Sequence, residues 1–365
     1  MTLKVLTVVG ARPQFIKAAA VSHALARADD VVEVLAHTGQ HHDHNLSEVF
    51  FEELNVPQPA YHLGISGGTH GAMTGRMLEG LESVISDEQP DWVLVYGDTN
   101  STIAGALAAV KLHVPIAHVE AGLRSFNLRM PEEVNRIVTD QISTLLLCPS
   151  ATAVRNLQSE GRTEGVHLVG DVMYDVALAF AEVAARQSRA LATFSLERSG
   201  YALATVHRAE NTDVPERLHS ILQALRDIAE DMPVIFPMHP RTRRVLESGP
   251  RTSLGRITVT EPLPFLDMLQ LERNAHSILT DSGGVQKEAF FYGIPCITMR
   301  DETEWTETVE LGWNRLAGAD SARILEAFRQ LGKPDRQPNV YGDGKAAEQI
   351  VELLRGSRER IRCAA

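Results

Sequence analysis

The chain has 365 residues, of which 44% are hydrophobic and 22% are charged, and this composition excludes a mostly disordered protein. The length suits two domains of ordinary size. The formal net charge of −12 argues against the broad basic surface that binding to nucleic acid or to an anionic membrane requires, so neither is an expected partner.

The N-terminus and the cysteines indicate the compartment. An apolar run at residues 3–9 stops at Gly10 after too few residues for a membrane span, and it lacks a small-residue cleavage site, so we predict a buried first strand. The cysteines are odd in number and far apart, at Cys148, Cys296 and Cys363. This spacing predicts neither a disulfide framework nor a thiolate metal site, and it favours a reducing, cytoplasmic compartment.

Short apolar runs alternate with longer segments of helical spacing, which predicts parallel sheets covered by helices. In the first half, strands are expected at residues 5–9, 31–36, 92–96, 116–119 and 145–148, and helices at 16–28, 73–85, 101–112 and 132–142. The rhythm restarts with strands at 202–206, 234–238, 257–260, 277–279 and 296–299, separated by helices such as 217–229. The fold class is therefore α/β, with two Rossmann-like, doubly wound domains facing a central cleft.

The domain limits follow from this rhythm. A first domain is expected at residues 1–170 and a second at 171–350, because an Ala-rich, charged helix without a strand occupies residues 171–199. The last helix, at 344–360, is amphipathic, and residues 351–365 are a candidate to pack back on the first domain.

Basic residues follow the first predicted strand, at the edge where open α/β sheets bind ligands. Gly10 precedes a helix with Arg12 and Lys17 at its start, and Arg12 suits a bidentate pair with a phosphate. The alternative is a solvated helix start. Neither G-x-G-x-x-G nor G-x-x-x-x-G-K-[ST] occurs, so the sequence gives no support for a nicotinamide dinucleotide or for P-loop ATP chemistry.

Three carboxylates follow the next strands. Asp98 and Glu120 end neighbouring strands, and Glu132 begins a helix that also carries Arg136. The alternatives are an N-cap role for Asp98 and a plain ion pair between Glu132 and Arg136. We predict an acid/base cluster, because several acids at one edge repel one another unless a function or a counter-charge retains them.

The second domain contains an outline of a phosphate site at residues 280–288. Two glycines and a serine follow an apolar run and precede a helix, where backbone N–H groups and the helix field favour an anion. A carboxylate one turn later suits the hydroxyls of a ribose. The candidate residues are Ser282, Gly283, Gly284 and Glu288, with His207 at the end of another strand. The alternative is a tight turn with a helix cap formed by Asp281 or Ser282.

No metal site is predicted. His118, His207 and His239 follow or occupy different strands without the spacing of metal ligands, and the histidines at 41–44 are interpreted as a polar helix start. The acidic segment at 300–307 has two open interpretations, which are contact with the sugar or uracil of a ligand and solvated surface.

With these pieces in order, the chain resembles the non-hydrolysing UDP-N-acetylglucosamine 2-epimerases over nearly its full length. The segments that carry the resemblance are Gly10-Ala-Arg-Pro-Gln-Phe-Ile-Lys, Tyr96-Gly-Asp-Thr, His118-Val-Glu-Ala-Gly-Leu-Arg, Pro131-Glu-Glu-Val-Asn-Arg, Val206-His-Arg, Thr280-Asp-Ser-Gly-Gly-Val-Gln-Lys-Glu and Tyr341-Gly-Asp-Gly. The resemblance implies a fold like that of GT-B glycosyltransferases, a UDP-sugar substrate, a homodimer, a role in cell-surface polysaccharide biosynthesis, and neither a metal nor a nicotinamide cofactor.

The resemblance also implies a reaction. A base removes the C2 proton while the C1–O bond to UDP breaks, and the resulting 2-acetamidoglucal is protonated on the opposite face before UDP returns, which interconverts UDP-GlcNAc and UDP-ManNAc. By motif match, the catalytic residues are Asp98, Glu120, Glu132 and His207. The matching substrate-binding residues are Arg12, Lys17, Arg136, His207, Ser282, Gly283, Gly284 and Glu288. A glycosyltransferase on the same fold is a more distant alternative.

Departures from the family pattern leave the sugar open. Gln14 stands where many members have glutamate, and residues 40–43 and 239–242 differ from segments that bind a second, activating UDP-sugar. Gln14 and the segment 301–307 are also similar to relatives that epimerise UDP-2,3-diacetamido-2,3-dideoxyglucuronate, which is the alternative substrate.

Overall fold

The computed structural model describes residues 2–40, 57–249 and 253–364, apart from the side chains of Arg12 and of residues 358–364. The chain divides into two compact units. The first consists of Met1–Val176 and Asn339–Ala365, and the second of Ala177–Pro338. The chain therefore crosses between units at 176/177 and 338/339. The limits predicted from the sequence are 170/171 and 350/351.

The first unit contains a parallel sheet of seven strands in the order β3-β2-β1-β4-β5-β6-β7. The strands are β1 (Leu3–Val9), β2 (Val31–His37), β3 (Tyr61–His62), β4 (Trp92–Tyr96), β5 (Ile116–Val119), β6 (Leu145–Cys148) and β7 (Val166–Leu168). Because β1 pairs with both β2 and β4, the strand order reverses at β1. In an open α/β sheet this reversal opens a crevice at the carboxyl ends of the strands, where ligands bind.

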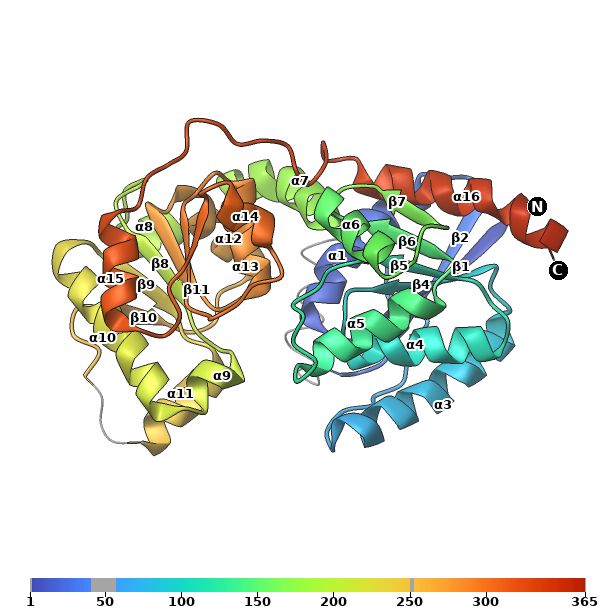
Figure 1. Cartoon of the computed structure of the whole chain (residues 1–365), viewed down its shortest axis with the longest axis horizontal. Helices are drawn as coiled ribbons and strands as arrows, with labels where there is room; N and C mark the ends of the chain where they lie inside the picture. Colours follow the sequence, from blue (N-terminus) through green and yellow to red (C-terminus); the bar gives the residue numbers. More distant parts are fainter. Residues whose placement is uncertain (1, 41–56, 250–252, 365) are drawn as a thin grey trace. The chain divides into compact units, whose positions relative to one another are not determined.

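Helices cover both faces of this sheet (Figure 1). Helices α3 (His70–Glu88), α4 (Asn100–Lys111) and α5 (Pro131–Ile142) pack side by side on one face, and α1 (Arg12–Ala26) and α16 (Ala346–Ala364) pack together on the other. Helix α6 (Ala151–Ser159) contacts β6 and β7. The final helix is fixed to the sheet by Trp92, whose indole Nε1 donates to the Leu354 carbonyl at 3.2 Å.

The second unit contains a parallel sheet of six strands in the order β10-β9-β8-β11-β12-β13. The strands are β8 (Ala202–Thr205), β9 (Val234–Pro237), β10 (Thr258–Thr260), β11 (Ser277–Thr280), β12 (Cys296–Thr298) and β13 (Asn314–Leu316). The helices are α8 (Ala190–Thr193), α9 (Ala209–Thr212), α10 (Pro215–Asp231), α11 (Pro240–Ser248), α12 (Phe265–Asn274), α13 (Gly283–Phe291), α14 (Thr306–Glu310) and α15 (Ser321–Arg329). Helix α7 (Val172–Gln187) contains the first crossing between units.

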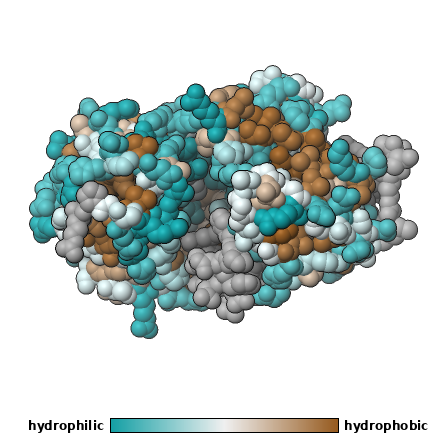
Figure 2. All heavy atoms as spheres, turned by 90° about the horizontal axis from the view of Figure 1, so that it is seen from below, coloured by the Kyte–Doolittle hydropathy of each residue, from teal (hydrophilic) through white to brown (hydrophobic). Residues whose placement is uncertain are grey.

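Apolar side chains fill the interior of each unit. The central strands β4 and β5 are buried along their whole length, as expected for a sheet covered on both faces. On the face drawn in Figure 2, apolar side chains form patches between polar ones. Of the described helices, none combines the length and the apolar character that a bilayer crossing needs.

The α/β class with two Rossmann-like sheets is confirmed. All ten expected strands are present with ends that differ by at most two residues, and residues 171–199 contain helices α7 and α8 without a strand. The short edge strands β3, β7 and β13 were not expected. Strands of two or three residues are too short for a periodic pattern to distinguish them from loop.

Candidate active site

A buried glutamine holds the turn after β1. Gln14 accepts hydrogen bonds from the backbone N–H groups of Gly10 (2.8 Å) and Ala11 (3.0 Å) through Oε1, and it donates through Nε2 to the Tyr96 carbonyl (2.9 Å) and to Thr102 Oγ1 (3.0 Å). An ionised glutamate could not donate the last two bonds. The glutamine therefore ties the β1 turn to the end of β4.

This turn leads into helix α1 and to Lys17. The Lys17 ammonium forms an ion pair with the Glu120 carboxylate, and both side chains are largely buried. Glu120 follows β5 with φ of 68°, a left-handed conformation that is uncommon outside glycine and is concentrated at functional sites. The pair lies over Gly97, because a Cβ atom there would be 3.1 Å from Glu120 Oε2 and 3.3 Å from Lys17 Nζ.

A second charged cluster forms between β4 and α5. The Arg136 guanidinium is 3% exposed and bridges two carboxylates, with Nη2 on Asp98 and Nη1 on Glu133. Asn135 donates to the Asp98 carbonyl at 2.9 Å. The two alternative interpretations are therefore wrong: Thr99, not Asp98, caps α4, and Arg136 pairs with Glu133 and Asp98 rather than with Glu132.

Glu132 has a different environment from the other two candidate acids. It lies in the first turn of α5, directly after Pro131, and is half-buried. Within the described part of the chain it makes no side-chain hydrogen bond or ion pair, so its carboxylate remains able to exchange a proton with a ligand. In this unit the structure thus brings together Lys17 with Glu120 and Asp98 with Arg136.

In the second unit, Asp281 organises the end of β8. Its buried carboxylate accepts hydrogen bonds from the backbone N–H groups of His207 (3.0 Å) and Arg208 (3.0 Å) and from Asn211 Nδ2 (3.1 Å). His207 Nδ1 lies 3.3 Å from the same carboxylate, which orients the ring and leaves Nε2 as its other polar atom. The His239 ring lies 5.3 Å from the His207 ring.

The glycine turn after β11 begins helix α13. Ser282 is the N-cap, and its hydroxyl oxygen accepts from Val285 N at 3.5 Å, so the helix cap named as the alternative interpretation is present. A capping hydroxyl still has a hydrogen to donate, so this role is compatible with phosphate binding. Gly283 is buried and Gly284 is exposed, and Glu288 is half-buried one turn along the helix.

The segment 300–307, after β12, packs against Gly283 in this turn. A Cβ atom on Gly283 would be 2.6 Å from Glu304 Oε1 and 3.4 Å from Trp305 Nε1. The Glu304 carboxylate accepts from buried Arg300 at 3.0 Å, and the Lys287 ammonium lies 4.2 Å from the centre of the Trp305 ring. The solvated-surface interpretation of residues 300–307 is therefore wrong for most of the segment, although Asp301 is exposed.

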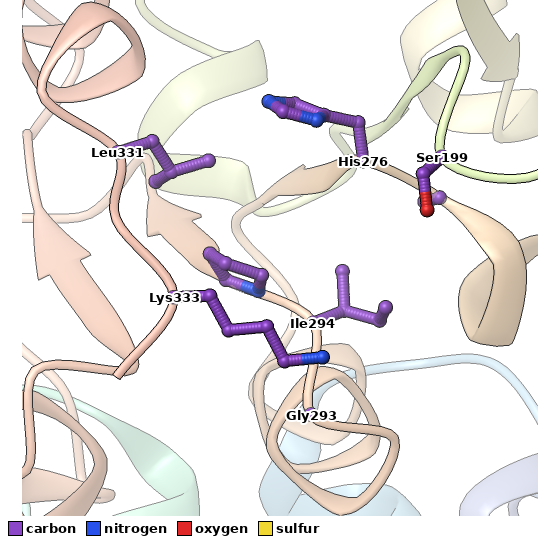
Figure 3. A pocket seen from close by; sticks show the side chains of 8 residues that line it. Ser199, His276, Gly293, Ile294, Leu331 and Lys333 are labelled. Atoms are coloured by element: carbon purple, nitrogen blue, oxygen red, sulfur yellow. The ribbon is translucent and has the colours of Figure 1, made fainter. Parts of the chain in front are cut away.

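A hollow at the opposite edge of this sheet is separate from these residues. It lies at the amino ends of β11 and β12, and its lining includes His276, Gly293, Ile294 and Lys333 (Figure 3). In open α/β sheets, ligands bind at the carboxyl ends of the strands.

Several predicted residues fall outside what the structure describes. These are the side chains of Arg12 and Cys363 and the histidines at 41–44. Among the described residues, no group of three or more His, Cys, Asp or Glu side chains could hold a metal ion. Sequence reasoning missed the organising roles of Gln14, Glu133 and Asp281, although all three lie inside the motifs that carry the family resemblance.

The two parallel sheets define a protein with a GT-B-like fold. A match at the level of fold alone is Phytolacca americana UGT2 complexed with UDP-2fluoro-glucose and pterostilbene, with a TM-score of 0.58, 12% identity and coverage of 99% of this chain and 94% of that chain.

Closer similarity identifies the family. A family model described as UDP-N-acetylglucosamine 2-epimerase matches residues 23–355. The UDP-2,3-diacetamido-2,3-dideoxy-D-glucuronate 2-epimerase of Pseudomonas aeruginosa is 54% identical over 360 residues, 96% of this chain and 99% of that protein. The crystal structure of Methanocaldococcus jannaschii UDP-GlcNAc 2-epimerase in complex with UDP-GlcNAc and UDP has a TM-score of 0.89 and 42% identity, covering 98% of this chain and all of that chain. The chain belongs to the UDP-N-acetylglucosamine 2-epimerase family and is a UDP-sugar 2-epimerase, an isomerase.

Proposed function

We propose that the substrate is UDP-2,3-diacetamido-2,3-dideoxyglucuronate and that the enzyme inverts its C2 centre. The observation that carries this proposal is the 54% identity, over 96% of the chain, to an epimerase of that name. This support is stronger than that for UDP-GlcNAc, the principal expectation from the sequence, since the solved UDP-GlcNAc 2-epimerase is 42% identical. UDP-GlcNAc remains the second candidate.

Two features, one in each unit, support this choice. Gln14 and the segment around Trp305 are the parts of the sequence that are similar to diacetamido-uronate epimerases. Both make defined contacts with neighbouring residues in the structure. Gln14 needs its amide to bond the Tyr96 carbonyl, and Glu304 and Trp305 lie directly behind Gly283. These residues are therefore part of how each turn is built, rather than neutral surface variation.

The second unit supplies the groups proposed to stabilise the leaving UDP. The C2 proton is weakly acidic, so breakage of the C1–O bond must be assisted by fixed hydrogen-bond donors and positive charge. Ser282 can donate its hydroxyl hydrogen, and the N–H groups at the start of α13 and its helix field favour the diphosphate. His207, oriented by Asp281, is a further proposed donor, and Glu288 is the proposed partner of the ribose. Arg12, in the first unit, is proposed to bind the phosphate by motif match.

The first unit supplies the groups proposed to move the proton. One carboxylate takes the proton from C2 as the C1–O bond breaks, giving a glycal and UDP, and a second acid delivers a proton to the other face before the C1–O bond forms again. Asp98, held by buried Arg136, Glu120, held by largely buried Lys17, and Glu132 are the proposed acid/base residues. Lys17 and Arg136 keep the first two carboxylates in place and balance their charge.

The substrate is tested by measuring kcat/KM for the two UDP-sugars with the same enzyme preparation. We expect kcat/KM for UDP-2,3-diacetamido-2,3-dideoxyglucuronate to exceed that for UDP-GlcNAc at least tenfold. A site that bonds a polar substituent of its substrate discriminates strongly against a sugar that lacks it. Equal values, or a higher value for UDP-GlcNAc, would overturn this substrate while leaving the reaction type intact.

A further inference from the structure

The first unit contains a cluster of four ionisable residues that the proposed reaction does not use, and three of them are buried. His118, in β5, and Asp140, in α5, are both fully buried, and His118 Nδ1 lies 2.7 Å from Asp140 Oδ1. Arg124 donates to Asp140 Oδ2 at 2.7 Å and forms a two-bonded ion pair with Glu160, each bond 2.7 Å long.

Both ring nitrogens of His118 face acceptors. Nε2 lies 2.7 Å from the carbonyl oxygen of Gly97. A backbone carbonyl can only accept, so Nε2 must carry a hydrogen. Nδ1 faces a carboxylate that already accepts from Arg124 and, at 3.1 Å, from the backbone N–H of Gly122. An ionised carboxylate also only accepts, so Nδ1 carries a hydrogen as well, and the ring is an imidazolium.

The partners of Asp140 support its ionised state. Buried Arg124 pairs with Asp140 on one side and with Glu160, which is exposed, on the other. Burial by itself would raise the pKa of Asp140, but His118 and Arg124 outweigh burial and lower it. Independently of His118, this carboxylate accepts from Arg124 and from the Gly122 N–H, as an ionised group does.

The hydrogen bonds of this pair end on the two turns that carry proposed acid/base residues. The Gly97 carbonyl belongs to the peptide that leads into Asp98, and Gly97 has φ of 61°. Asp140 holds the N–H of Gly122, two residues after Glu120, whose own φ is 68°. A left-handed non-glycine residue persists only where surrounding contacts fix it.

We propose that His118, held as an imidazolium by Asp140, is a positioning residue that fixes the turns carrying Asp98 and Glu120 for proton transfer. This inference rests on the proposed acid/base roles of those two carboxylates. His118 itself is fully buried. It acts through the Gly97 carbonyl and through Asp140.

The protonation state is tested on the wild-type protein by nitrogen NMR with histidine labelled with ¹⁵N, the His118 signals being those lost in His118→Gln. We expect both ring nitrogens of His118 to show the chemical shifts of protonated nitrogen at pH 8. One unprotonated ring nitrogen would overturn the proposal, and this result does not depend on whether any variant is active.

The positioning role is tested by kinetics of His118→Gln, in which an amide can still donate toward Gly97 but carries no charge and cannot donate to Asp140 at the same time. We expect kcat to fall about 10²-fold, because small misplacements of reacting groups have effects of this size, while KM for the UDP-sugar changes less than about threefold. The matched control is Thr7→Val in β1, which removes the hydrogen bond that another fully buried side chain of the same sheet donates to Glu33, at 2.5 Å. A kcat equal to that of the control would overturn the proposal.

The two proposals fail in different ways. A wild-type enzyme that epimerises neither UDP-sugar would contradict the proposed function, and the NMR measurement would still decide the state of His118. If His118→Gln does not fold, as judged by circular dichroism, Asp140→Asn replaces it. The asparagine removes the negative charge that requires the second ring proton, so the NMR spectrum of this variant should show a neutral His118. An imidazolium in this variant would show that the Asp140 charge does not keep His118 protonated, and it would overturn the proposal.

Discussion

Arg136 connects a proposed acid/base residue to the structure that supports it. Its guanidinium holds Asp98 through Nη2 and fully buried Glu133 through Nη1. Glu133 in turn accepts from the backbone N–H groups of Ser125 (3.0 Å) and Phe126 (2.9 Å). In Arg136→Lys the positive charge is kept, but a single ammonium replaces the planar fork and cannot reproduce both contacts.

The size of the effect follows from these contacts. We expect the lysine to stay with Glu133, because a fully buried carboxylate is the costlier one to leave unpaired, and therefore to release Asp98. Loss of one charge-assisted hydrogen bond costs about 1.5–3 kcal/mol, and about 1.4 kcal/mol changes a rate tenfold. kcat should fall about 10- to 100-fold. Arg136→Met leaves both carboxylates without the cation and should lower the free energy of unfolding by about 3–5 kcal/mol.

The assay is kcat for the UDP-sugar together with the free energy of unfolding in urea for both variants. The matched control is Arg243→Lys, which alters an exposed ion pair with Glu261 at 2.7 Å and should change stability by less than about 1 kcal/mol. A wild-type kcat in Arg136→Lys would show that Asp98 does not depend on its contact with the Arg136 guanidinium, and it would contradict this prediction.

Three further predictions address other parts of the molecule. Gly283→Ala places a methyl group 2.6 Å from Glu304 Oε1, so the free energy of unfolding should fall by about 1–3 kcal/mol and the Kd for UDP should rise at least tenfold. Gly284→Ala, with its nearest neighbouring atom at 3.9 Å, should retain wild-type stability. Asp98→Asn should abolish turnover, measured by product formation, while the Kd for UDP measured by calorimetry stays within about threefold. Burial raises the pKa of Asp175 to about 6, so its folded state binds a proton more tightly than its unfolded state, and its contribution to stability is lost as the pH rises from about 4 to about 6. Asp175→Asn should therefore raise the free energy of unfolding at pH 7.5 by about 1–3 kcal/mol, with a smaller gain at pH 5.

Each of these predictions has a result that would contradict it. Equal stability and equal UDP affinity in Gly283→Ala and Gly284→Ala would show that the Glu304 side chain moves away from the new methyl group without a measurable loss of free energy. Wild-type turnover in Asp98→Asn would remove Asp98 from the acid/base set. A gain in Asp175→Asn that is the same at pH 5 and pH 7.5 would show that ionisation of this carboxyl does not limit stability.

Much of this fold can be predicted from the sequence, because its strands are buried and its helices are amphipathic. Strands β4, β5 and β6 begin and end where their apolar runs do, so the apolar pattern alone is enough to assign the polar residues that follow them to the ligand-binding edge. Edge strands such as β3, which has two residues, carry too little pattern to be recognised.

The partners of the site residues could not be predicted in the same way. Helical spacing suggested that Glu132 would pair with Arg136, but the choice of Glu133 and Asp98 depends on how α5 lies against the end of β4. The imidazolium of His118 likewise depends on a carbonyl in one turn and a carboxylate in a helix, which no local pattern joins. The homodimer implied by the family resemblance stays a prediction.

Deuterium incorporation shows whether the enzyme removes and replaces the proton at C2. The wild-type enzyme is incubated in deuterated water with UDP-2,3-diacetamido-2,3-dideoxyglucuronate and, separately, with UDP-GlcNAc, and C2 of the product is examined by proton NMR and mass spectrometry. The proposed mechanism predicts a C2 epimer that carries one solvent-derived deuterium at C2, formed faster from the diacetamido uronate. Epimerised product without deuterium, or no product from either sugar, would contradict it.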